Sequence, residues 1–386
     1  MKAALLEDVK RMTMQTVPDP EVGEREVLIR VGAVGVCGTD LHLFQGDGNY
    51  NFDAQGRPIP LTVQPQILGH EFAGEVVEVG RGVKDLKPGD RVLCDQGRNC
   101  LSEGREQLCS YCASGDSHQC QYYREHGIMG LPGAMAEYLS ITAVNCIRLS
   151  DGTSFEQGAL AEPVACITHS SDRVDRSASR YTFGGLEEQS KGGELIRNVL
   201  IFGAGPAGLL FLQYLRNVKR FDGLILVADV REQNLKFVAQ FGGTPVNVAK
   251  DDLEKTVQEL TKGERIHYLI EACGNGAVYK LIPGLLRKQG TLLIYGAGHR
   301  AGNDLNLLDP IAFVEPTLVF SIGASGGFDP DGRPTIYRRA LELVSSGKVL
   351  VLPFVTHRYR ALDQIHKAFE EDFMRQDYIK GVLNLQ

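Results

Sequence analysis

Asn198-Val-Leu-Ile-Phe202 runs directly into Gly203-Ala204-Gly205-Pro206-Ala207-Gly208, and the apolar residues Leu209 to Leu215 follow at once. This order predicts a buried strand, a glycine-rich turn and a helix. In such a turn the first glycine allows a tight bend, the second lets the backbone approach a pyrophosphate, and the third lets the helix pack on the strand. The helix N-terminus attracts negative charge, and proline suits its first turn. The stretch therefore predicts a dinucleotide site.

The next expected strand, Leu224 to Ala228, is followed by Asp229. A carboxylate at this place can accept hydrogen bonds from both ribose hydroxyls and repels a 2′-phosphate, which favours NAD over NADP. Arg231 leaves an alternative open, because its guanidinium could bind a 2′-phosphate.

Two patterns of hydrophobic residues divide the chain. To about residue 160, short apolar runs such as Glu26–Val36 and Phe72–Val79 are separated by Gly and Pro, which predicts a β-rich half. From Asn198 onward apolar runs alternate with helical periodicity, which predicts a parallel sheet with helices between its strands. Further strands are expected at His267–Ala272, Thr291–Tyr295 and Thr317–Ile322.

The C-terminal part has a pattern of its own. Two helices are expected near Thr335–Ser346 and Tyr359–Glu371, and a short apolar run follows over Tyr378–Leu383. We expect this part to return to the β-rich half. The predicted fold is therefore α/β, with one domain over residues 1–165 and 330–386 and a doubly wound parallel sheet over residues 166–329.

Bulk properties limit the kind of partner. A chain of 386 residues exceeds what one hydrophobic core usually supports, which agrees with two domains. Its net charge of -7 and the lack of a basic run argue against nucleic acid. There is no apolar stretch of roughly 20 residues for a membrane span, and the N-terminus does not have the pattern of a signal peptide. We expect a cytoplasmic protein that acts on a small molecule.

Two long polar segments, Gln45–Gln66 and Ser170–Gly193, are expected to be loops. Long loops in compact domains are more often functional than idle. The first contains Asp47, Asn49, Asn51, Asp53 and Arg57, which could select a ligand with many hydroxyls or could form an interface. The second could equally be a surface insertion.

Metal-ligating residue types occur in three separate segments. Cys37 lies in Gly35-Val-Cys37-Gly-Thr39-Asp40-Leu-His42, His70 and Glu71 lie in Gly69-His70-Glu71-Phe-Ala-Gly74, and Glu162 lies in Ala161-Glu162-Pro163. A cysteine could simply be a small buried hydrophobe. However, three ligands from separate segments with one position left open are typical of a catalytic zinc, whereas a structural zinc has four protein ligands.

Together with the glycine motif, these segments occur in an order that resembles the zinc-containing medium-chain alcohol and polyol dehydrogenases, of the sorbitol, threonine and inositol type. The resemblance spans essentially the whole chain. It implies a GroES-like catalytic domain and a Rossmann NAD-binding domain. It also implies that Cys37 and His70 bind zinc, with Glu71 or Glu162 as the third ligand.

Further roles follow from the same resemblance. Asp40 is expected to orient the zinc-bound histidine, which fixes its tautomer. Thr39 and His42 resemble a proton relay, although His42 could be a structural histidine. Lys380 resembles the basic residue that reaches the cofactor pyrophosphate, and a solvated surface lysine is an equal alternative.

A second group of cysteines lies at positions 94, 100, 109, 112 and 120. The family usually has a structural zinc held by a C-x2-C-x2-C-x7-C motif, and Cys109, Cys112 and Cys120 match its last three members. The first member is missing. Glu106 stands three residues before Cys109 and is the preferred replacement, followed by Cys100, with Cys94 as a further alternative. A lobe that binds no metal is also open.

The resemblance predicts a dehydrogenase that uses NAD. A bound zinc would polarise the substrate hydroxyl, and hydride would pass to the nicotinamide. The proton would leave through Thr39 and His42, or through a water held by Glu71 or Glu162. A polyol, cyclitol or sugar is the expected substrate. The alternatives are a threonine-type amino-alcohol dehydrogenase and a nucleotide-binding relative without catalysis, and the family suggests a homodimer or homotetramer.

Overall fold

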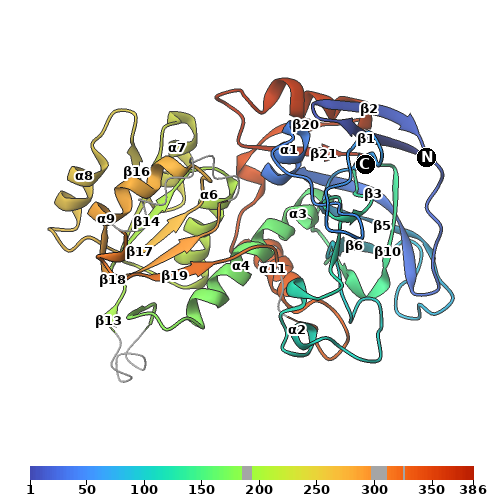
Figure 1. Ribbon diagram of the computed structural model, residues 1–386, viewed down its shortest axis with the longest axis horizontal. Helices are drawn as coiled ribbons and strands as arrows, with labels where there is room; N and C mark the ends of the chain where they lie inside the picture. Colours follow the sequence, from blue (N-terminus) through green and yellow to red (C-terminus); the bar gives the residue numbers. More distant parts are fainter. Residues whose placement is uncertain (185–193, 297–310, 325–326) are drawn as a thin grey trace. The chain divides into compact units, whose positions relative to one another are not determined.

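The computed structural model describes residues 1–184, 194–296, 311–324 and 327–386 (Figure 1). The chain divides into two compact units, one made of residues 1–166 with 323–386 and the other of residues 167–322. Within the described residues, no helix combines the length and apolar character that crossing a membrane requires.

The first unit is built on a seven-stranded sheet in which β11, β6, β5, β3, β21 and β20 follow one another and β10 also pairs with β3. The expected strand Glu26–Val36 is confirmed as β3, and the run expected at Phe72–Val79 is β5. Alternate residues of β3, such as Val27, Ile29 and Val31, enter the core. The strands are β3 (Glu26–Val36), β5 (Glu71–Val79), β6 (Arg91–Cys94), β10 (Tyr138–Thr142), β11 (Cys146–Arg148), β20 (Val355–Tyr359) and β21 (Lys380–Asn384).

The C-terminal part returns to this sheet, as expected. Strand β21 pairs antiparallel with β3, with Gly381 opposite Val36 and Asn384 opposite Ala33. In Figure 1 the red C-terminal strand accordingly lies beside the blue β3. Helix α11 (Thr335–Ser345) is confirmed.

The helix expected over Tyr359–Glu371 is only partly confirmed. Tyr359 ends β20, and after the 3₁₀ turn Leu362–Gln364 the chain is helical over residues 366–372, which include the π turn Ala368–Asp372. Because Tyr359 pairs with Leu383 across β20 and β21, tertiary pairing overrides the helical spacing of the apolar residues.

Smaller elements complete the first unit. A three-stranded sheet has the order β2-β1-β4, and another three-stranded sheet has the order β7-β8-β9. The bounds are β1 (Lys2–Asp8), β2 (Arg11–Thr16), β4 (Gln66–Ile67), β7 (Gly97–Arg98), β8 (Arg124–His126), β9 (Gly130–Leu131), α1 (Gly38–Gln45), α2 (Ser110–Ala113), α3 (Phe155–Ala159) and α4 (Ala161–Asp175). Helix α4 continues across the boundary into the second unit.

The second unit contains a six-stranded sheet with the order β16-β15-β14-β17-β18-β19, and all of its neighbouring strands are parallel. In sequence order this is 3-2-1-4-5-6, the arrangement of a doubly wound dinucleotide-binding sheet. The strands are β14 (Asn198–Phe202), β15 (Leu224–Asp229), β16 (Thr244–Asn247), β17 (Ile266–Glu271), β18 (Leu286–Ile294) and β19 (Thr317–Phe320). Its helices include α6 (Pro206–Gln213), α7 (Glu232–Gln240), α8 (Leu253–Leu260) and α9 (Ile282–Leu285).

Strand β16 was not predicted from the sequence. This strand is the short edge segment Thr-Pro-Val-Asn, and proline and asparagine are both uncommon inside strands. The expected strands that became β14, β15, β17, β18 and β19 are confirmed, with end points that shift by a few residues.

The two expected loops have different outcomes. Between α1 and β4, residues 46–65 form a loop with one isolated bridge between Phe52 and Pro58, as expected. The loop expected over Ser170–Gly193 is partly wrong, because residues 170–175 belong to α4 and β12 (Tyr181–Thr182) follows. Ser170 is buried in this helix and donates to Ser321 Oγ at 2.9 Å, so its polarity does not mark a loop. Residues 185–193 lie outside the described residues.

Candidate active site and lobe metal site

One carboxylate joins the two segments that contain the expected catalytic ligands. Strand β3 ends at Val36, Cys37 precedes α1, and the Cys37 backbone N–H donates to Asp40 Oδ2 at 2.8 Å. The backbone N–H of Gly69 donates to Asp40 Oδ1 at 3.1 Å. Asp40 is fully buried, and its Oδ1 also lies 3.4 Å from His70 Nδ1. This position suits the expected role of orienting the histidine.

Cys37, His70 and Glu71 come together in what we call the inner cluster. One ligand atom from each residue lies within 4.8 Å of the others. His70 and Glu71 are buried, whereas Cys37 is half-buried. The structure thus groups Glu71 with Cys37 and His70, and Glu162 is not in this group.

Register explains why Glu71 fits here. Gly35 on β3 pairs with Glu71 on β5, and a Cβ at position 35 would lie 1.9 Å from Glu71 Oε2. The carboxylate therefore occupies space that only a glycine leaves.

Lys380 differs from one of the two sequence-based expectations. It is buried, and its Nζ donates to Glu71 Oε1 at 2.6 Å, so it is not a solvated surface lysine. Burial alone would lower the pKa of Lys380, but Glu71 and Cys37 beside it raise that pKa above its usual value. The expected contact with a pyrophosphate stays a prediction, and in the structure the ammonium pairs with a buried carboxylate.

The inner cluster fits a divalent cation. Glu71 Oε2 is buried and has no hydrogen-bond partner among the described residues, while Oε1 is taken by Lys380. Burial would lower the pKa of His70, but Asp40 and Cys37 raise it well above its usual value. A thiol, an imidazole and a carboxylate with one unpartnered oxygen form the donor set of a catalytic zinc site.

Glu162 belongs to a buried polar network instead. Gln96 donates through Nε2 to Glu162 Oε1 and to Glu125 Oε1, each at 3.0 Å, and Tyr337 donates to Gln96 Oε1. Burial raises the pKa of Glu162 to about 7, although the charge of His70 opposes this. Our sequence reasoning missed Gln96, Glu125 and Tyr337, because single polar residues in unrelated segments carry no spacing signal.

The expected relay residues share one face of α1. Thr39 and His42 are three residues apart, so their side chains are neighbours on the helix. Cys37 Sγ lies 3.8 Å from Thr39 Oγ1, and His42 Nδ1 lies 3.3 Å from Asp47 Oδ2. The His42 side chain is 32% exposed, which does not suit a purely structural core histidine.

The second group of cysteines forms what we call the lobe cluster, made of Cys100, Cys109, Cys112 and Cys120. Their sulfur atoms all lie within 4.8 Å of one another, and all four residues are buried. Cys100 Sγ is 3.6 Å and Cys109 Sγ is 3.8 Å from Cys120 Sγ.

The preference for Glu106 as the missing ligand is thereby corrected. Glu106 is exposed and lies outside the cluster, whereas the turn after β7 brings Cys100 into it. Cys94 is also outside, because it pairs with Cys146 across β6 and β11, with sulfur atoms 3.7 Å apart.

Four buried thiols fit a closed structural zinc site. Hydrogen bonds from the backbone amides of Cys112 and Gln121 lower the pKa of Cys109 to about 6. Such donors stabilise a thiolate, which is the form that binds metal. The backbone N–H of Tyr122 donates to Cys120 Sγ at 3.3 Å and opposes the effect of burial, which raises the pKa of Cys120 above its usual value.

The glycine turn of the second unit has the expected geometry. Gly203 has φ +101°, and a Cβ on Gly208 would lie 1.9 Å from the Gly203 carbonyl oxygen. Gly205 is open, because the nearest atom to a Cβ there would be an Arg231 nitrogen at 3.8 Å. Pro206 is the first residue of α6. These features fit a pyrophosphate against the helix N-terminus.

Asp229 lies at the end of β15 and holds this turn. Its Oδ2 accepts from the Ala204 N–H at 2.7 Å, and its Oδ1 accepts from the Arg231 N–H at 2.8 Å. The Arg231 guanidinium lies 3.5 Å from the same carboxylate.

Comparison with known proteins agrees with both units. Residues 23–151 match the family described as the alcohol dehydrogenase GroES-like domain, and residues 206–346 match the family described as zinc-binding dehydrogenase.

Full-length relatives extend the likeness. The chain is 28% identical over 361 residues to a sorbitol dehydrogenase of Bombyx mori, covering 92% of this chain and 91% of that protein. It is 29% identical over 359 residues to an L-threonine 3-dehydrogenase of Escherichia fergusonii, covering 92% of each. A zinc-binding dehydrogenase of Sinorhizobium meliloti 1021, solved with NADP bound, has a TM-score of 0.78 at 25% identity and covers 99% of this chain and 98% of its own.

Proposed function

Because the chain belongs to the zinc-containing medium-chain alcohol and polyol dehydrogenases, we propose that it transfers a hydride between a secondary alcohol of a polyol, cyclitol or sugar and NAD. The grouping of Cys37, His70 and Glu71 carries this proposal. A protein that only bound a nucleotide would not need a buried carboxylate oxygen without a partner in such a group.

In this proposal Cys37, His70 and Glu71 hold the zinc ion. When bound, zinc supplies a Lewis acid that polarises the substrate hydroxyl. Asp40 fixes the two segments that present Cys37 and His70, and Lys380 holds the Glu71 carboxylate through Oε1. These contacts preorganise the three donor atoms.

The proton leaves along α1. Thr39 presents its hydroxyl beside Cys37, where it can accept the substrate proton through a hydrogen bond, and His42 lies on the same helix face. His42 is partly exposed and faces Asp47, so it can pass the proton to solvent. The second unit would hold the nicotinamide cofactor, which would supply the hydride acceptor.

The polyol class is supported by the polar surroundings of His70. Its charge affects the pKa of both Glu125 and Glu162, so these two carboxyl groups lie near it. Carboxylate oxygens can accept hydrogen bonds from substrate hydroxyls. The loop after α1 gives less support for a polyol substrate, because its polar side chains bind within the loop. Asn49 donates to the Ile59 carbonyl at 2.7 Å, and Arg57 pairs with Asp53.

NAD is the proposed nicotinamide cofactor because Asp229 ends β15, the second strand of the parallel sheet, and an acidic side chain at this place favours ribose hydroxyls over a 2′-phosphate. Arg231 is the feature that would support NADP instead. Steady-state kinetics with both cofactors test this proposal. A higher kcat/KM with NAD, lost in Asp229→Ser, supports it, whereas a preference for NADP that Arg231→Ser abolishes contradicts it.

A threonine-type amino-alcohol activity is the second candidate, since an L-threonine 3-dehydrogenase is among the relatives. Such an enzyme must recognise a substrate ammonium group. If threonine is oxidised while the same alcohol without its ammonium group is not, this candidate replaces the polyol class.

We also propose a homodimer or homotetramer. Strand β19 is at one end of the parallel sheet, and Leu318, Phe320 and Ile322 around it are 46%, 62% and 71% exposed. An apolar edge of this kind is a template for pairing with a second chain. Sedimentation should show an oligomer that Phe320→Lys weakens, and a monomeric wild type would contradict the proposal.

The nine free cysteines fit a reducing, cytoplasmic setting.

The direct test of function is reduction of NAD with polyols, cyclitols, sugars, threonine and simple alcohols, before and after chelation. Turnover with a polyol, cyclitol or sugar that chelation abolishes and zinc restores is expected. Tight NAD binding with no zinc and no turnover on any substrate would favour the non-catalytic alternative.

A further inference from the structure

Cys100 reaches the lobe cluster on a turn of its own. The other three cysteines lie close together in sequence, around α2 and the 3₁₀ turn Ser117–Gln119, whereas Cys100 comes from residues 99–104. Asn99 Oδ1 accepts from the N–H of Leu101 at 3.0 Å and from the N–H of Ser102 at 3.1 Å. The turn is therefore tight, but these bonds are internal and do not fix it against the other cysteines.

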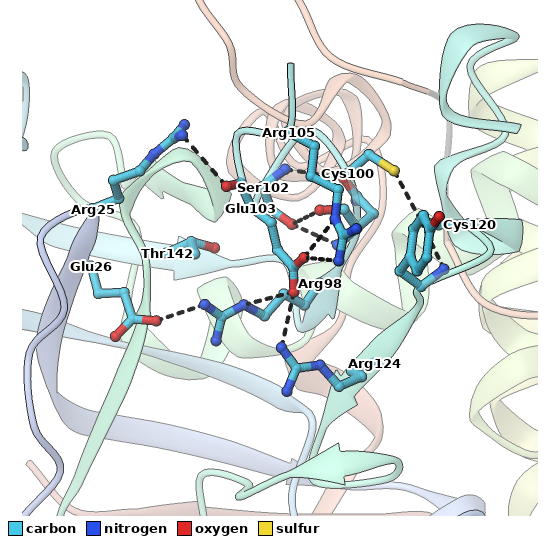
Figure 2. A network of polar contacts seen from close by, with 12 residues as sticks. Arg25, Glu26, Arg98, Cys100, Ser102, Glu103, Arg105, Cys120, Arg124 and Thr142 are labelled. Carbon is cyan, nitrogen blue, oxygen red and sulfur yellow. Dashed lines mark hydrogen bonds and ion pairs between the residues drawn. The ribbon is translucent and has the colours of Figure 1, made fainter. Parts of the chain in front are cut away.

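External contacts come from Glu103, at the end of the same turn. Its Oε2 accepts from Arg105 Nε at 2.9 Å, and its Oε1 accepts from Arg124 Nη2 at 2.9 Å and lies 3.7 Å from Arg98 Nε. Figure 2 shows these three guanidinium groups converging on this one carboxylate. The Glu103 side chain is only 16% exposed. Burial alone would raise its pKa, but hydrogen bonds from Arg124 and Arg105 lower it.

Each arginine connects the turn to a different part of the unit. Arg124 begins β8, and Arg98 ends β7 and pairs with Glu26 on β3 at 3.0 Å. Arg105 stacks on the Tyr122 ring at 3.9 Å, two residues after Cys120. The Arg105 N–H also donates to the Cys100 carbonyl at 2.9 Å. Glu103 therefore links the backbone of Cys100 to the segment that holds Cys120.

We propose that Glu103 is a positioning residue that holds Cys100 in place. Cys100, and not the exposed Glu106, is then the fourth ligand of the lobe metal. This inference rests on the proposed zinc in the lobe cluster. Without the Glu103 charge, Arg105 and Arg124 would lose the anion that they share, and Arg98, which keeps its pair with Glu26, would no longer contact it, so the guanidinium groups would repel one another. The turn would loosen, and the sulfur of Cys100 would leave the metal more often.

The experiment uses the full-length protein in a Cys37→Ser background, so that the remaining zinc is the lobe zinc. Glu103→Gln keeps the size of the side chain and removes its charge. Glu106→Gln is the matched control, because it makes the same change three residues away at an exposed site outside the cluster. Zinc transfer to a chromogenic chelator gives the release rate, and the absorption spectrum of the cobalt-substituted protein reports the number of thiolate ligands.

We expect Glu103→Gln to release zinc about tenfold faster or more and to lose thiolate-to-cobalt absorption, as is usual when a residue supporting a ligand is changed. Glu106→Gln and the charge-conserving Glu103→Asp should stay near the parent. If Glu103→Gln fails to fold, Arg124→Gln replaces it, because Arg124 is 46% exposed and the variant removes one contact to Glu103. It should also accelerate release.

Two results would overturn the inference in distinguishable ways. If the parent holds zinc and neither Glu103→Gln nor Arg124→Gln changes its release or its cobalt spectrum, Glu103 does not position Cys100. If the parent binds no zinc at all, the proposed lobe zinc site is wrong, and the positioning role that rests on it is wrong as well.

Discussion

The inner cluster and the lobe cluster are both built around cysteine, but they are assembled in opposite ways. In the inner cluster Cys37 comes from one segment and His70 and Glu71 come from another. Lys380, near the C-terminus, contacts Glu71. The lobe cluster takes four thiols from residues 100–120 alone. Three ligands leave a position for substrate, whereas four thiolates close the tetrahedron. We propose that this difference separates a catalytic zinc site from a structural one.

The largest expected effect is on the inner cluster. Cys37→Ser should remove one zinc ion and lower kcat/KM by on the order of a thousandfold or more, because a Lewis acid contributes several kcal/mol and each 1.36 kcal/mol is tenfold. Metal analysis and steady-state kinetics measure both effects. Cys146→Ser, a buried cysteine outside both clusters, should keep its zinc. An active Cys37→Ser protein without the inner zinc would refute the assignment.

A smaller effect is expected from Gly35→Ala. The new Cβ would lie 1.9 Å from Glu71 Oε2, so the carboxylate must shift while Lys380 holds its other oxygen. Activity and inner zinc affinity should fall about 10- to 100-fold, with the lobe zinc unchanged. Gly38→Ala is the control, because nothing lies within 4 Å of a Cβ there. Equal behaviour of the two variants would show that Glu71 is not a ligand.

On the lobe side the main effect should be on stability. Cys100→Ser opens the four-thiol group, so the lobe zinc should be lost and the free energy of unfolding should fall by about 2 to 5 kcal/mol. Activity measured well below the melting temperature should fall far less than in Cys37→Ser. Thermal denaturation and metal analysis test this. Glu106→Gln should match the wild type, and zinc loss in Glu106→Gln but not in Cys100→Ser would restore the original assignment.

The smallest expected effect concerns pH. His126 on β8 is buried, and burial lowers its pKa to about 4, with Arg98 and Arg124 contributing and Glu26 opposing. The folded state therefore favours the neutral imidazole of His126. In the unfolded chain the same imidazole takes up a proton near pH 6.5. The stability that neutral His126 provides is complete above that pH and is lost as the pH falls towards 4, by up to about 3 kcal/mol.

His126→Gln should make unfolding less sensitive to pH across this window. Denaturant unfolding from pH 7.5 to pH 5, in wild type and variant, measures the difference. Parallel stability curves for the two proteins would contradict this interpretation.

The sequence allowed the strands around the glycine motif to be predicted, because apolar runs and glycine spacing are local signals. Cys37 and His70 could be named from the family motifs that contain them, whereas the third ligand stayed open between Glu71 and Glu162. Cys100 was ranked below Glu106, because the family spacing says nothing about a turn held by Glu103 and its arginines. The contact between Lys380 and Glu71 joins residues 309 positions apart, and it depends on β21 pairing with β3. No local pattern reveals such a contact.

Zinc per chain and activity, measured together in the wild type, Cys37→Ser, Cys100→Ser and the double variant, decide whether the two clusters are separate metal sites. Two distinct clusters predict about two zinc ions in the wild type, one in each single variant and none in the double variant, with activity abolished only where Cys37 is changed. If Cys37→Ser keeps both zinc ions and its activity, the inner cluster is not the catalytic metal site.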